Sequence, residues 1–305
     1  MKIIILAVIL AVLLFLLAGY IGFTVACYRR TGKIMGTGAP SLEPYLEQMD
    51  EGRRWFLGMK PERVEIVSYD GLRLSGLYLI NPEAKGTIIL MHGYRMDGYT
   101  DFTCVYKKYY DLGYSLLNAF QRAHVDSEGE YITFGIKERF DCRDWAEYIA
   151  DRFGPEHKIV LDGLSMGAAT VLMAAGLELP ENVKGIIADC GFTSPWEQLM
   201  FVIKNKYHLP ARPLMDSVDI FAKLLGGFSF KEYSTLDAMK VNTRPILFLH
   251  GEADDFVPTY FSVRNFEACQ APKRLITVPN AAHGVSYLVD PDTCNAELDK
   301  FLMNI

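Results

Sequence analysis

The chain has 305 residues, 50% of them hydrophobic, and its 31 basic and 37 acidic side chains leave a net charge of −6. A chain of this length and composition can bury a sizeable core and suits one large α/β domain with an appendage. Binding of nucleic acid would need clustered lysine and arginine side chains, and a mildly acidic chain without a basic stripe gives no reason to expect it. Small molecules are therefore the expected partners.

The N-terminal segment is apolar, since no residue from Ile3 through Tyr28 carries a charge. As a helix, this run is long enough to cross a hydrocarbon core of about 30 Å. Residues 1–28 are therefore predicted to form a transmembrane anchor that is not part of the folded domain. Two alternatives are open: a cleaved signal peptide, although the run exceeds the usual apolar length, and a lipoprotein signal at residues 24–27, which resemble a lipobox only loosely.

The flanking charges and the cysteines bear on the side of the membrane. Lys2 precedes the apolar segment and three basic residues follow it, namely Arg29, Arg30 and Lys33. The positive-inside tendency therefore places the domain in the cytoplasm. Reduced thiols fit the cysteine pattern best, because the number after the anchor is odd and no metal-type pair spacing occurs; an exported domain with one or two disulfides and a spare thiol is the alternative. These cysteines are Cys104, Cys142, Cys190, Cys269 and Cys294.

Residues 29–60 are predicted to hold a linker and a juxtamembrane helix. The glycine density of 31–40 marks a flexible linker. A helix over 41–59 follows, for which Ser41 can serve as cap and Pro44 suits the first turn. Its apolar face is expected to pack on the domain, with contact to the membrane surface as the alternative. The face consists of Tyr45, Met49 and Phe56, with Trp55 beside them.

The domain proper is predicted to span 61–305. Two alternating segments, 64–69 and 72–80, meet at Asp70-Gly71 and predict a β-hairpin. Further apolar strands with helical spacers predict an α/β fold with a mostly parallel central sheet flanked by helices. These strands are 87–91, 114–118, 158–162, 184–189, 245–249 and 274–278.

One motif follows the strand at 158–162 and precedes a helix-compatible stretch: Gly163-Leu164-Ser165-Met166-Gly167. Strand, sharp turn and helix with a glycine on each side are typical of a nucleophile elbow, in which a strained backbone projects the serine hydroxyl. Ser165 is therefore the predicted nucleophile. A glycine-rich loop with a solvated serine is the alternative.

A serine hydroxyl is a poor nucleophile unless a histidine takes its proton and a carboxylate orients the histidine. Asp254 and His283 each stand in a loop that follows an apolar strand. The chain order Ser, Asp, His is the one expected of an α/β-hydrolase sheet. From about Val64 to Ile305 the sequence resembles the α/β-hydrolase family, and it looks closest to single-pass bacterial serine hydrolases of the esterase or acyl-hydrolase type.

Two other carboxylates compete for the role of the acid. Asp255 adjoins Asp254, and Asp189 ends a strand at a position that some family members use. Asp254 is preferred because its offset from Gly251 and from the following Pro258 matches the acid loop of the family.

The loop after the strand at 87–91 is predicted to contribute to an oxyanion hole. Its donors would be the backbone N–H groups of Tyr94 and of Met166, the residue after the nucleophile. A lipase-like run of three glycines is absent there, which weakens any case for bulky tertiary-alcohol esters. His92 opens the loop and is predicted to be a structural hydrogen-bonding residue, with a role as a second base as the alternative.

Residues 121–129 resemble the arginine-histidine-glycine loop that is common in the family at this point, but Val125 replaces the usual glycine. The charged side chains of Arg122, Asp126 and Glu128 are predicted to form a hydrogen-bonded network that stabilises the loop. A metal or substrate site is the alternative.

An insertion at about 191–240 interrupts the alternation of strands and helices and is predicted to be a helical cap over the strand ends. Its aromatic side chains can line an apolar substrate site or pack the cap onto the sheet. They are Trp196, Phe201, Tyr207, Phe221, Phe228, Phe230 and Tyr233. Prolines at 195, 210 and 213 predict short, broken helices.

The predicted function is that of a membrane-anchored serine hydrolase with its catalytic domain in the cytoplasm. Ser165 would attack the carbonyl of a small-molecule acyl ester, His283 would take the proton, and water would release the acyl-enzyme, with no cofactor or metal needed. Peptidase, thioesterase and acyltransferase activities on the same residues stay open. So does a non-catalytic, membrane-tethered binding protein that keeps the fold.

Overall fold

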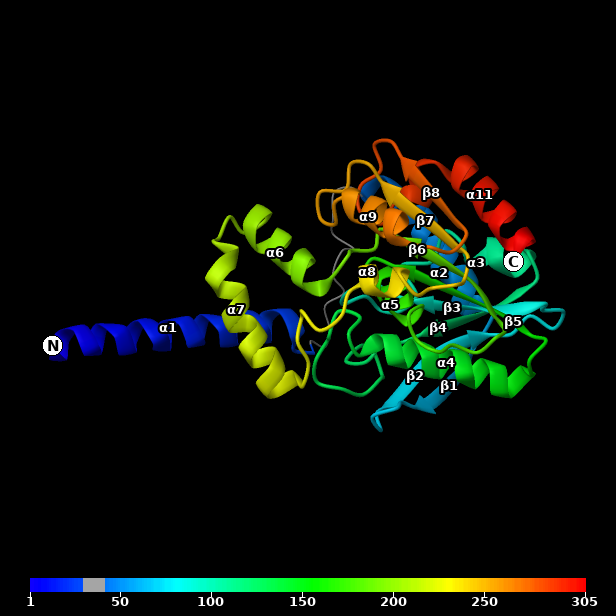
Figure 1. Cartoon of the computed structure of the whole chain (residues 1–305). Coiled ribbons are helices and arrows are strands. Elements are labelled where there is room, and N and C mark those ends of the chain that lie inside the picture. The colour runs from blue at the N-terminus through cyan, green and yellow to red at the C-terminus, as the bar shows by residue number, and fades with distance from the viewer. Residues whose placement is uncertain (30–41) are drawn as a thin grey trace.

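The computed structural model describes residues 1–29 and 42–305. Its first element is α1 (Lys2–Cys27), a single helix of 26 residues that projects from the body of the protein (Figure 1). Among the described residues, it is the one helix long and apolar enough to cross a membrane. Most of its side chains are exposed, whereas Gly19, Phe23 and Cys27 near its end are buried.

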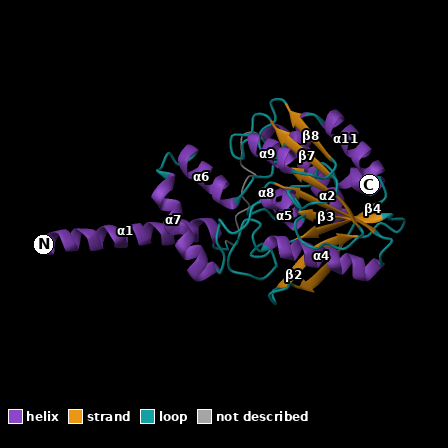
Figure 2. Ribbon diagram, viewed as in Figure 1, coloured by secondary structure: helices purple, strands orange, loops and turns teal. Residues whose placement is uncertain are grey.

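An eight-stranded sheet forms the body, in the order β1-β2-β4-β3-β5-β6-β7-β8 (Figure 2). The pairs β1–β2 and β2–β4 are antiparallel and the remaining pairs are parallel. The predicted hairpin and mostly parallel sheet are thus confirmed. The strands are β1 (Glu62–Val67), β2 (Arg73–Leu79), β3 (Gly86–Met91), β4 (Tyr114–Ala119), β5 (Lys158–Leu164), β6 (Val183–Asp189), β7 (Ile246–Gly251) and β8 (Lys273–Val278).

Helices cover both faces of the sheet, which is why the interior strands β3, β4 and β7 are buried along their whole length. One apolar cluster joins the sheet to α4 (Glu138–Phe153), α5 (Met166–Ala174), α8 (Thr235–Met239) and α9 (Tyr260–Ala268). A second cluster joins the other face to α2 (Leu46–Gly58), α3 (Tyr106–Asp111), α10 (Ser286–Val289) and α11 (Pro291–Asn304).

The predicted juxtamembrane helix is α2, preceded by the short 3₁₀ turn η1 (Glu43–Tyr45). Its apolar face packs on the domain as expected. Phe56 is fully buried and stacks on Tyr106 with ring centroids 4.4 Å apart. The predicted linker at 31–40 and the predicted cap Ser41 lie outside the described residues.

The predicted cap lies between β6 and β7 and consists of short helices. They are α6 (Pro195–Asn205), α7 (Ala211–Phe221), the π-helical turn η2 (Ala222–Gly226) and α8. Non-helical backbone at Arg212 interrupts α7 near its start, as the prolines predicted. The cap packs on α1 through a third apolar cluster, which includes Phe23 of α1 and Met215 and Val218 of α7; Figure 1 shows the two helices crossing.

The end of α1 is also bonded to the body of the domain. Nη2 of Arg95 donates to the carbonyl oxygens of Val25 (2.7 Å) and Tyr28 (3.2 Å), and the N–H of Ile132 donates to the carbonyl of Cys27 (2.7 Å). The expectation that residues 1–28 lie outside the fold is therefore wrong for the last turns of α1. The sequence could not reveal this, because an apolar helix reads the same whether lipid or protein surrounds it.

Candidate active site

Ser165 stands at the turn between β5 and α5. Its backbone is left-handed, with φ 57° and ψ −113°, a strained conformation for any residue other than glycine. The turn is so tight that a Cβ at Gly163 would collide with the backbone of Gly167, and a Cβ at Gly167 with the carbonyl of Met91. The local structure is thus the elbow that the motif predicts, and the hydroxyl of Ser165 lines a cavity.

His283 lies between Ser165 and Asp254, which are far apart in the chain. Its Nε2 is 2.9 Å from Oγ of Ser165, and its Nδ1 is 2.6 Å from Oδ2 of Asp254. A carboxylate can only accept, so Nδ1 carries the proton and Nε2 is left to accept from the serine hydroxyl. The three residues therefore have the geometry required for transfer of a proton from serine to histidine.

The loop after β7 holds Asp254 in a fixed orientation. Its Oδ1 accepts from the N–H groups of Phe256 (2.9 Å) and Val257 (2.8 Å), and the side chain is buried. Burial by itself raises the pKa of Asp254, but His283 and His250 outweigh it and hold that pKa well below its usual range. Asp254 is accordingly a carboxylate at neutral pH.

His250, which the sequence analysis left without a role, supports Asp254 from the other side. Its Nε2 lies 3.2 Å from Oδ2 of Asp254 and 2.7 Å from the carbonyl of Val257, and its Nδ1 lies 2.7 Å from Oγ of Ser262. Both partners of Nε2 are acceptors, so Nε2 carries the proton and Nδ1 accepts from the serine. The feature of the sequence that could have indicated this role is the position of His250 at the end of β7, four residues before Asp254.

The two rival carboxylates lie elsewhere. The side chain of Asp255 is 83% exposed and pairs with Lys206 at 2.6 Å. Asp189 is buried, which raises its pKa to about 6, and its Oδ1 accepts a hydrogen bond of 3.5 Å from the hydroxyl of Ser286. Of the three candidates, Asp254 is the one within hydrogen-bond distance of His283.

The electrostatics of His283 follow from this arrangement. Burial alone lowers the pKa of His283, but the charge of Asp254 and the hydrogen bond to it raise the pKa by more, with smaller contributions from Asp189 and Asp101. A raised pKa makes the imidazole a stronger base, which suits the removal of a proton from Ser165.

The predicted oxyanion donors, Tyr94 and Met166, line the same cavity as Ser165. The N–H of Met166 belongs to the first turn of α5, where backbone N–H groups have no partner inside the helix and the helix dipole favours negative charge. In the facing loop, the N–H of Gly93 donates to Oδ2 of Asp101 at 2.6 Å. Asp101 was not anticipated from the sequence, and burial raises its pKa to about 7.

His92 is fully buried. Its Nε2 accepts from the N–H of Gln121 at 3.1 Å and its Nδ1 lies 2.8 Å from the carbonyl of Gly93. Burial lowers the pKa of His92 to about 4, so the ring is neutral. The contacts are those of a structural hydrogen-bonding residue, as predicted.

The charged residues of the 121–129 loop do not converge. Arg122 is buried and pairs with Asp141 (2.6 Å) and Asp70 (2.8 Å), whereas Asp126 pairs with Arg63 and Glu128 with Arg73. Each side chain holds the loop by an ion pair to another segment, as expected of a stabilising role, but the three do not share one network and do not come together as a metal or substrate site.

Among the described residues, three potential metal ligands lie within 4.8 Å of one another: Cys190, Asp254 and His283. Both ring nitrogens of His283 already have partners, and burial raises the pKa of Cys190 well above its ordinary value. A neutral thiol is a poor ligand. The cluster is thus explained by the hydrogen-bonded chain through His283.

Two cavities meet at Ser165. The larger, of about 650 Å³, is mostly apolar and is walled by α1, α6, α7 and the loops next to Ser165. The smaller, of about 320 Å³, is lined by His283 and Asp101 together with Met49 of α2 and residues of the histidine loop. Of the aromatic cap residues, Tyr207 lines the larger cavity, while Phe228 and Phe230 are buried in the cap cluster.

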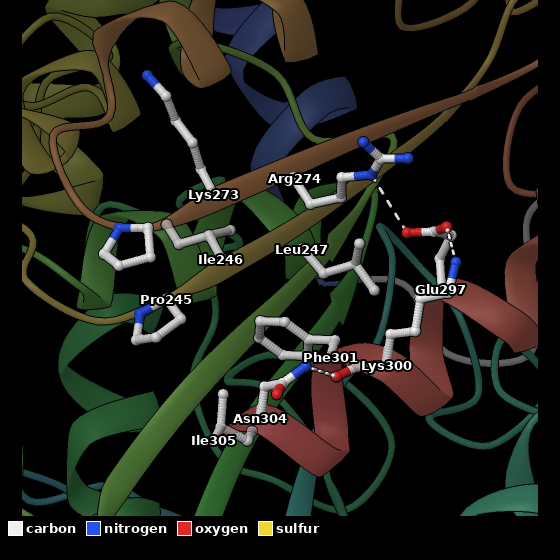
Figure 3. Close-up of a pocket in the computed structure, with 11 residues that line it drawn as sticks. Pro245, Ile246, Leu247, Lys273, Arg274, Glu297, Lys300, Phe301, Asn304 and Ile305 are labelled. Atoms are coloured by element: carbon white, nitrogen blue, oxygen red, sulfur yellow. Dashed lines mark hydrogen bonds and ion pairs between the residues drawn. The ribbon is translucent and has the colours of Figure 1, made fainter.

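A third hollow, of about 350 Å³, lies at the opposite edge of the sheet, where β7 and β8 begin and α11 ends (Figure 3). Its polar groups include an ion-pair set in which Glu297 bridges Arg274 (3.2 Å) and Lys300 (2.7 Å). Ligands of α/β sheets bind at the carboxyl ends of the strands, where Ser165 lies, so this hollow is separate from the site.

The sheet, the elbow and the loops at the carboxyl ends of β5, β7 and β8 define a serine hydrolase of the α/β-hydrolase superfamily. The model of the prolyl oligopeptidase family, Peptidase_S9, matches residues 133–303. The chain belongs to this family.

The chain also has relatives among uncharacterized proteins. The chain is 30% identical over 250 residues to the uncharacterized protein YqkD of Bacillus subtilis, covering 82% of both chains. It is 23% identical to the uncharacterized membrane protein YNL320W of Saccharomyces cerevisiae, covering 76% of this chain and 77% of that one.

Among solved structures, the esterase Pf2001 of Pyrococcus furiosus has a TM-score of 0.66 at 22% identity, over 82% of this chain and 95% of that chain. Est1E of Butyrivibrio proteoclasticus, with ferulic acid bound, has a TM-score of 0.59 at 17% identity, over 79% and 98%. These matches show that the fold is shared.

Proposed function

We propose that the chain hydrolyses carboxylic esters with apolar acyl groups. His283 takes the proton of Ser165 as Oγ attacks the ester carbonyl, and the N–H groups of Tyr94 and Met166 hold the oxyanion of the tetrahedral intermediate. His283 then gives its proton to the departing alcohol. Water, activated by the same imidazole, releases the acid from the acyl-enzyme.

The position of Ser165 at the junction of the two cavities, 2.9 Å from Nε2 of His283, carries this proposal. The imidazole must reach the leaving alcohol, so the alcohol side of the ester belongs in the smaller cavity, which contains His283. The acyl group then enters the larger cavity, whose apolar lining suits a hydrocarbon chain.

A peptidase on the same residues is the second candidate, and the name of the family favours it. Recognition of a peptide uses main-chain hydrogen bonds and pockets for side chains. The larger cavity has few polar groups, and one of them, Gln198, donates its amide to the carbonyl of Phe256. This lining supports an ester or thioester with an apolar acyl group over a peptide.

The experiment is a substrate panel with the purified full-length chain. It contains acyl esters, the matching thioesters and short peptides, and labelling of the enzyme with a fluorophosphonate is followed in parallel. We expect labelling and turnover of esters. Labelling with turnover of peptides alone would favour the second candidate, and no labelling at all would mean a binding protein without an activated serine.

We also propose a domain arrangement and a location. The hydrolase domain spans 61–305 with the cap at 191–240, residues 29–60 connect it to α1, and α1 anchors it in a membrane with the domain in the cytoplasm. Six cysteines without a disulfide support a reducing compartment. The variant Val241→Cys introduces a cysteine at a position that is 63% exposed. This cysteine should react with a membrane-impermeant maleimide only after cells are permeabilised. Labelling in intact cells would contradict the location.

A further inference from the structure

The wall of the larger cavity includes the membrane helix itself. Ala18, Ile21 and Val25 of α1 line the cavity that contains Ser165. The same stretch of helix is fastened on both sides, because Arg95 binds the carbonyl of Val25 and α7 packs against α1. An apolar helix long enough to cross a membrane is therefore part of a substrate pocket.

The mouth of this cavity can be located from side chains that line it and are nevertheless exposed. Ile21 is 51% and Val25 47% exposed on α1, and Tyr207 is 65% and Leu209 50% exposed on the segment between α6 and α7. These side chains are apolar or aromatic and come from two elements, α1 and the segment between α6 and α7. Contiguous apolar surface around an opening is typical of contact with a membrane or a protein partner.

The length of α1 places this mouth relative to a bilayer. Ile21 follows Lys2 by 19 residues, which is about 28 Å along a helix. A hydrocarbon core is about 30 Å thick. With Lys2 at the far surface, Ile21 and Val25 reach the near surface of the membrane, where the acyl chains of lipids meet their polar headgroups.

The cap packs on α1 from Tyr20, at the level of the mouth, to Phe15, which lies about 9 Å further into the bilayer than Ile21. Oγ of Ser217 in α7 donates to the carbonyl of Phe15 at 2.8 Å, and Tyr20 contacts Phe221 with ring centroids 5.6 Å apart. The turn after α7 exposes further apolar side chains, Leu224 at 72% and Leu225 at 46%. A helix with exposed leucines at this depth lies in the membrane interface.

We infer that the enzyme takes its substrate from the bilayer: an ester of a long-chain fatty acid whose acyl chain passes between α1 and the α6–α7 segment into the larger cavity. This inference rests on the proposed function and names its substrate class. The headgroup side of the ester remains in the smaller cavity beside His283. Hydrolysis breaks the acyl C–O bond, the alcohol leaves with the proton from His283, and water supplies the oxygen and proton of the released acid.

The test uses full-length protein reconstituted in phosphatidylcholine vesicles. Two p-nitrophenyl esters are compared, the water-soluble butyrate and the palmitate incorporated in the bilayer. Val25→Trp narrows the mouth on α1, and Leu13→Trp is the matched control on the same helix, since Leu13 is exposed and does not line the cavity. We expect Val25→Trp to lower the ratio of palmitate to butyrate turnover by at least about tenfold, whereas Leu13→Trp leaves the ratio unchanged.

A second variant approaches the mouth from the cap. Leu209→Asp puts a charge on the rim, and Val241→Asp is its control at an exposed apolar residue outside the cavity. The ratio of palmitate to butyrate turnover should fall for Leu209→Asp and not for Val241→Asp. This comparison still tests the inference if Val25→Trp on α1 fails to fold. An unchanged ratio in both mouth variants would overturn the inference.

Measurements on the wild-type protein distinguish a failure of this inference from a failure of the proposed function. Turnover of butyrate without turnover of palmitate in vesicles would overturn the inference and leave ester hydrolysis standing. Failure to react with either ester and with a fluorophosphonate would overturn the proposed function, and the inference with it.

Discussion

Arg95 donates a hydrogen bond of 2.7 Å from Nη2 to the carbonyl oxygen of Val25, so the loop that carries Tyr94 is tied to the last turns of α1. The hydroxyl of Tyr94 donates to the neighbouring carbonyl of Ala26, also at 2.7 Å. The predicted oxyanion loop and the end of α1 are therefore one structural unit. Changes at the end of α1 should reach the active site.

Two truncations test this coupling. Removal of residues 1–14 leaves Phe15 and its hydrogen bond from Ser217 of α7 in place, and it should preserve turnover of short soluble esters. Removal of residues 1–28 takes away the buried Phe23 and Cys27 and the acceptors of Arg95. Loss of the phenylalanine alone costs about 3–5 kcal/mol of stability. The longer truncation should therefore have a lower temperature of thermal unfolding and a lower rate of ester turnover. Equal activity of the two proteins would show that α1 is only an anchor.

Replacement of Ser165 by alanine should lower kcat for esters by about 10⁶ and abolish fluorophosphonate labelling. The fold should persist, because alanine fits the turn and the hydrogen bond to His283 contributes about 1 kcal/mol. Circular dichroism and the urea midpoint check the second point. Turnover retained by the purified variant would rule out Ser165 as the nucleophile.

The choice of acid can be tested with three asparagine variants. Asp254→Asn should lower kcat by about 10⁴, because the neutral side chain no longer holds the tautomer of His283 or stabilises its charge. Asp255→Asn changes an exposed ion pair and should have little effect on kcat. Asp189→Asn serves as the buried control. A loss confined to the Asp189 variant would transfer the role to that residue.

The pH profile of kcat/KM should follow His283. The imidazole must be neutral to take the proton of Ser165, so activity falls as the pH drops through the pKa of His283. Asp254 raises that pKa above its ordinary value, which places the acid limb above about pH 6.5. In Asp254→Asn the raising charge is gone, and the acid limb of the residual activity should move to lower pH. An acid limb at the same pH in both proteins would assign it to another group.

Val125 offers a test of stability away from the site. This residue has φ 48°, where a β-branched side chain is strained. Its carbonyl accepts a hydrogen bond from Nη2 of Arg29 at 2.5 Å, so a side chain outside the loop stabilises the strained conformation of Val125. Val125→Gly should raise the free energy of unfolding by up to about 1 kcal/mol, as relief of strain exceeds the entropy cost of glycine. Val67→Gly, in an exposed strand position, should lower it; urea titration measures both.

The sequence by itself determined the local structure of the domain. The eight strands, the hairpin at Asp70-Gly71 and the elbow at Ser165 follow from patterns within about ten residues, since alternation, glycine positions and strand length act over short distances. The order of Ser165, Asp254 and His283 was also enough to place each in a loop at the carboxyl edge of the sheet.

Only the tertiary structure decided which groups meet there. His283 is 118 residues from Ser165 and 29 from Asp254. The loop pattern favoured Asp254, but the contact of one carboxylate with His283 depends on side-chain positions of a few ångström, which only the fold sets. The support of Asp254 by His250 was hidden for the same reason. The packing of α1 on the domain could not be predicted for a different reason. A hydrophobic side chain loses contact with water equally in lipid and in protein, so the sequence predicts that Phe23 is buried but not whether lipid or protein surrounds it.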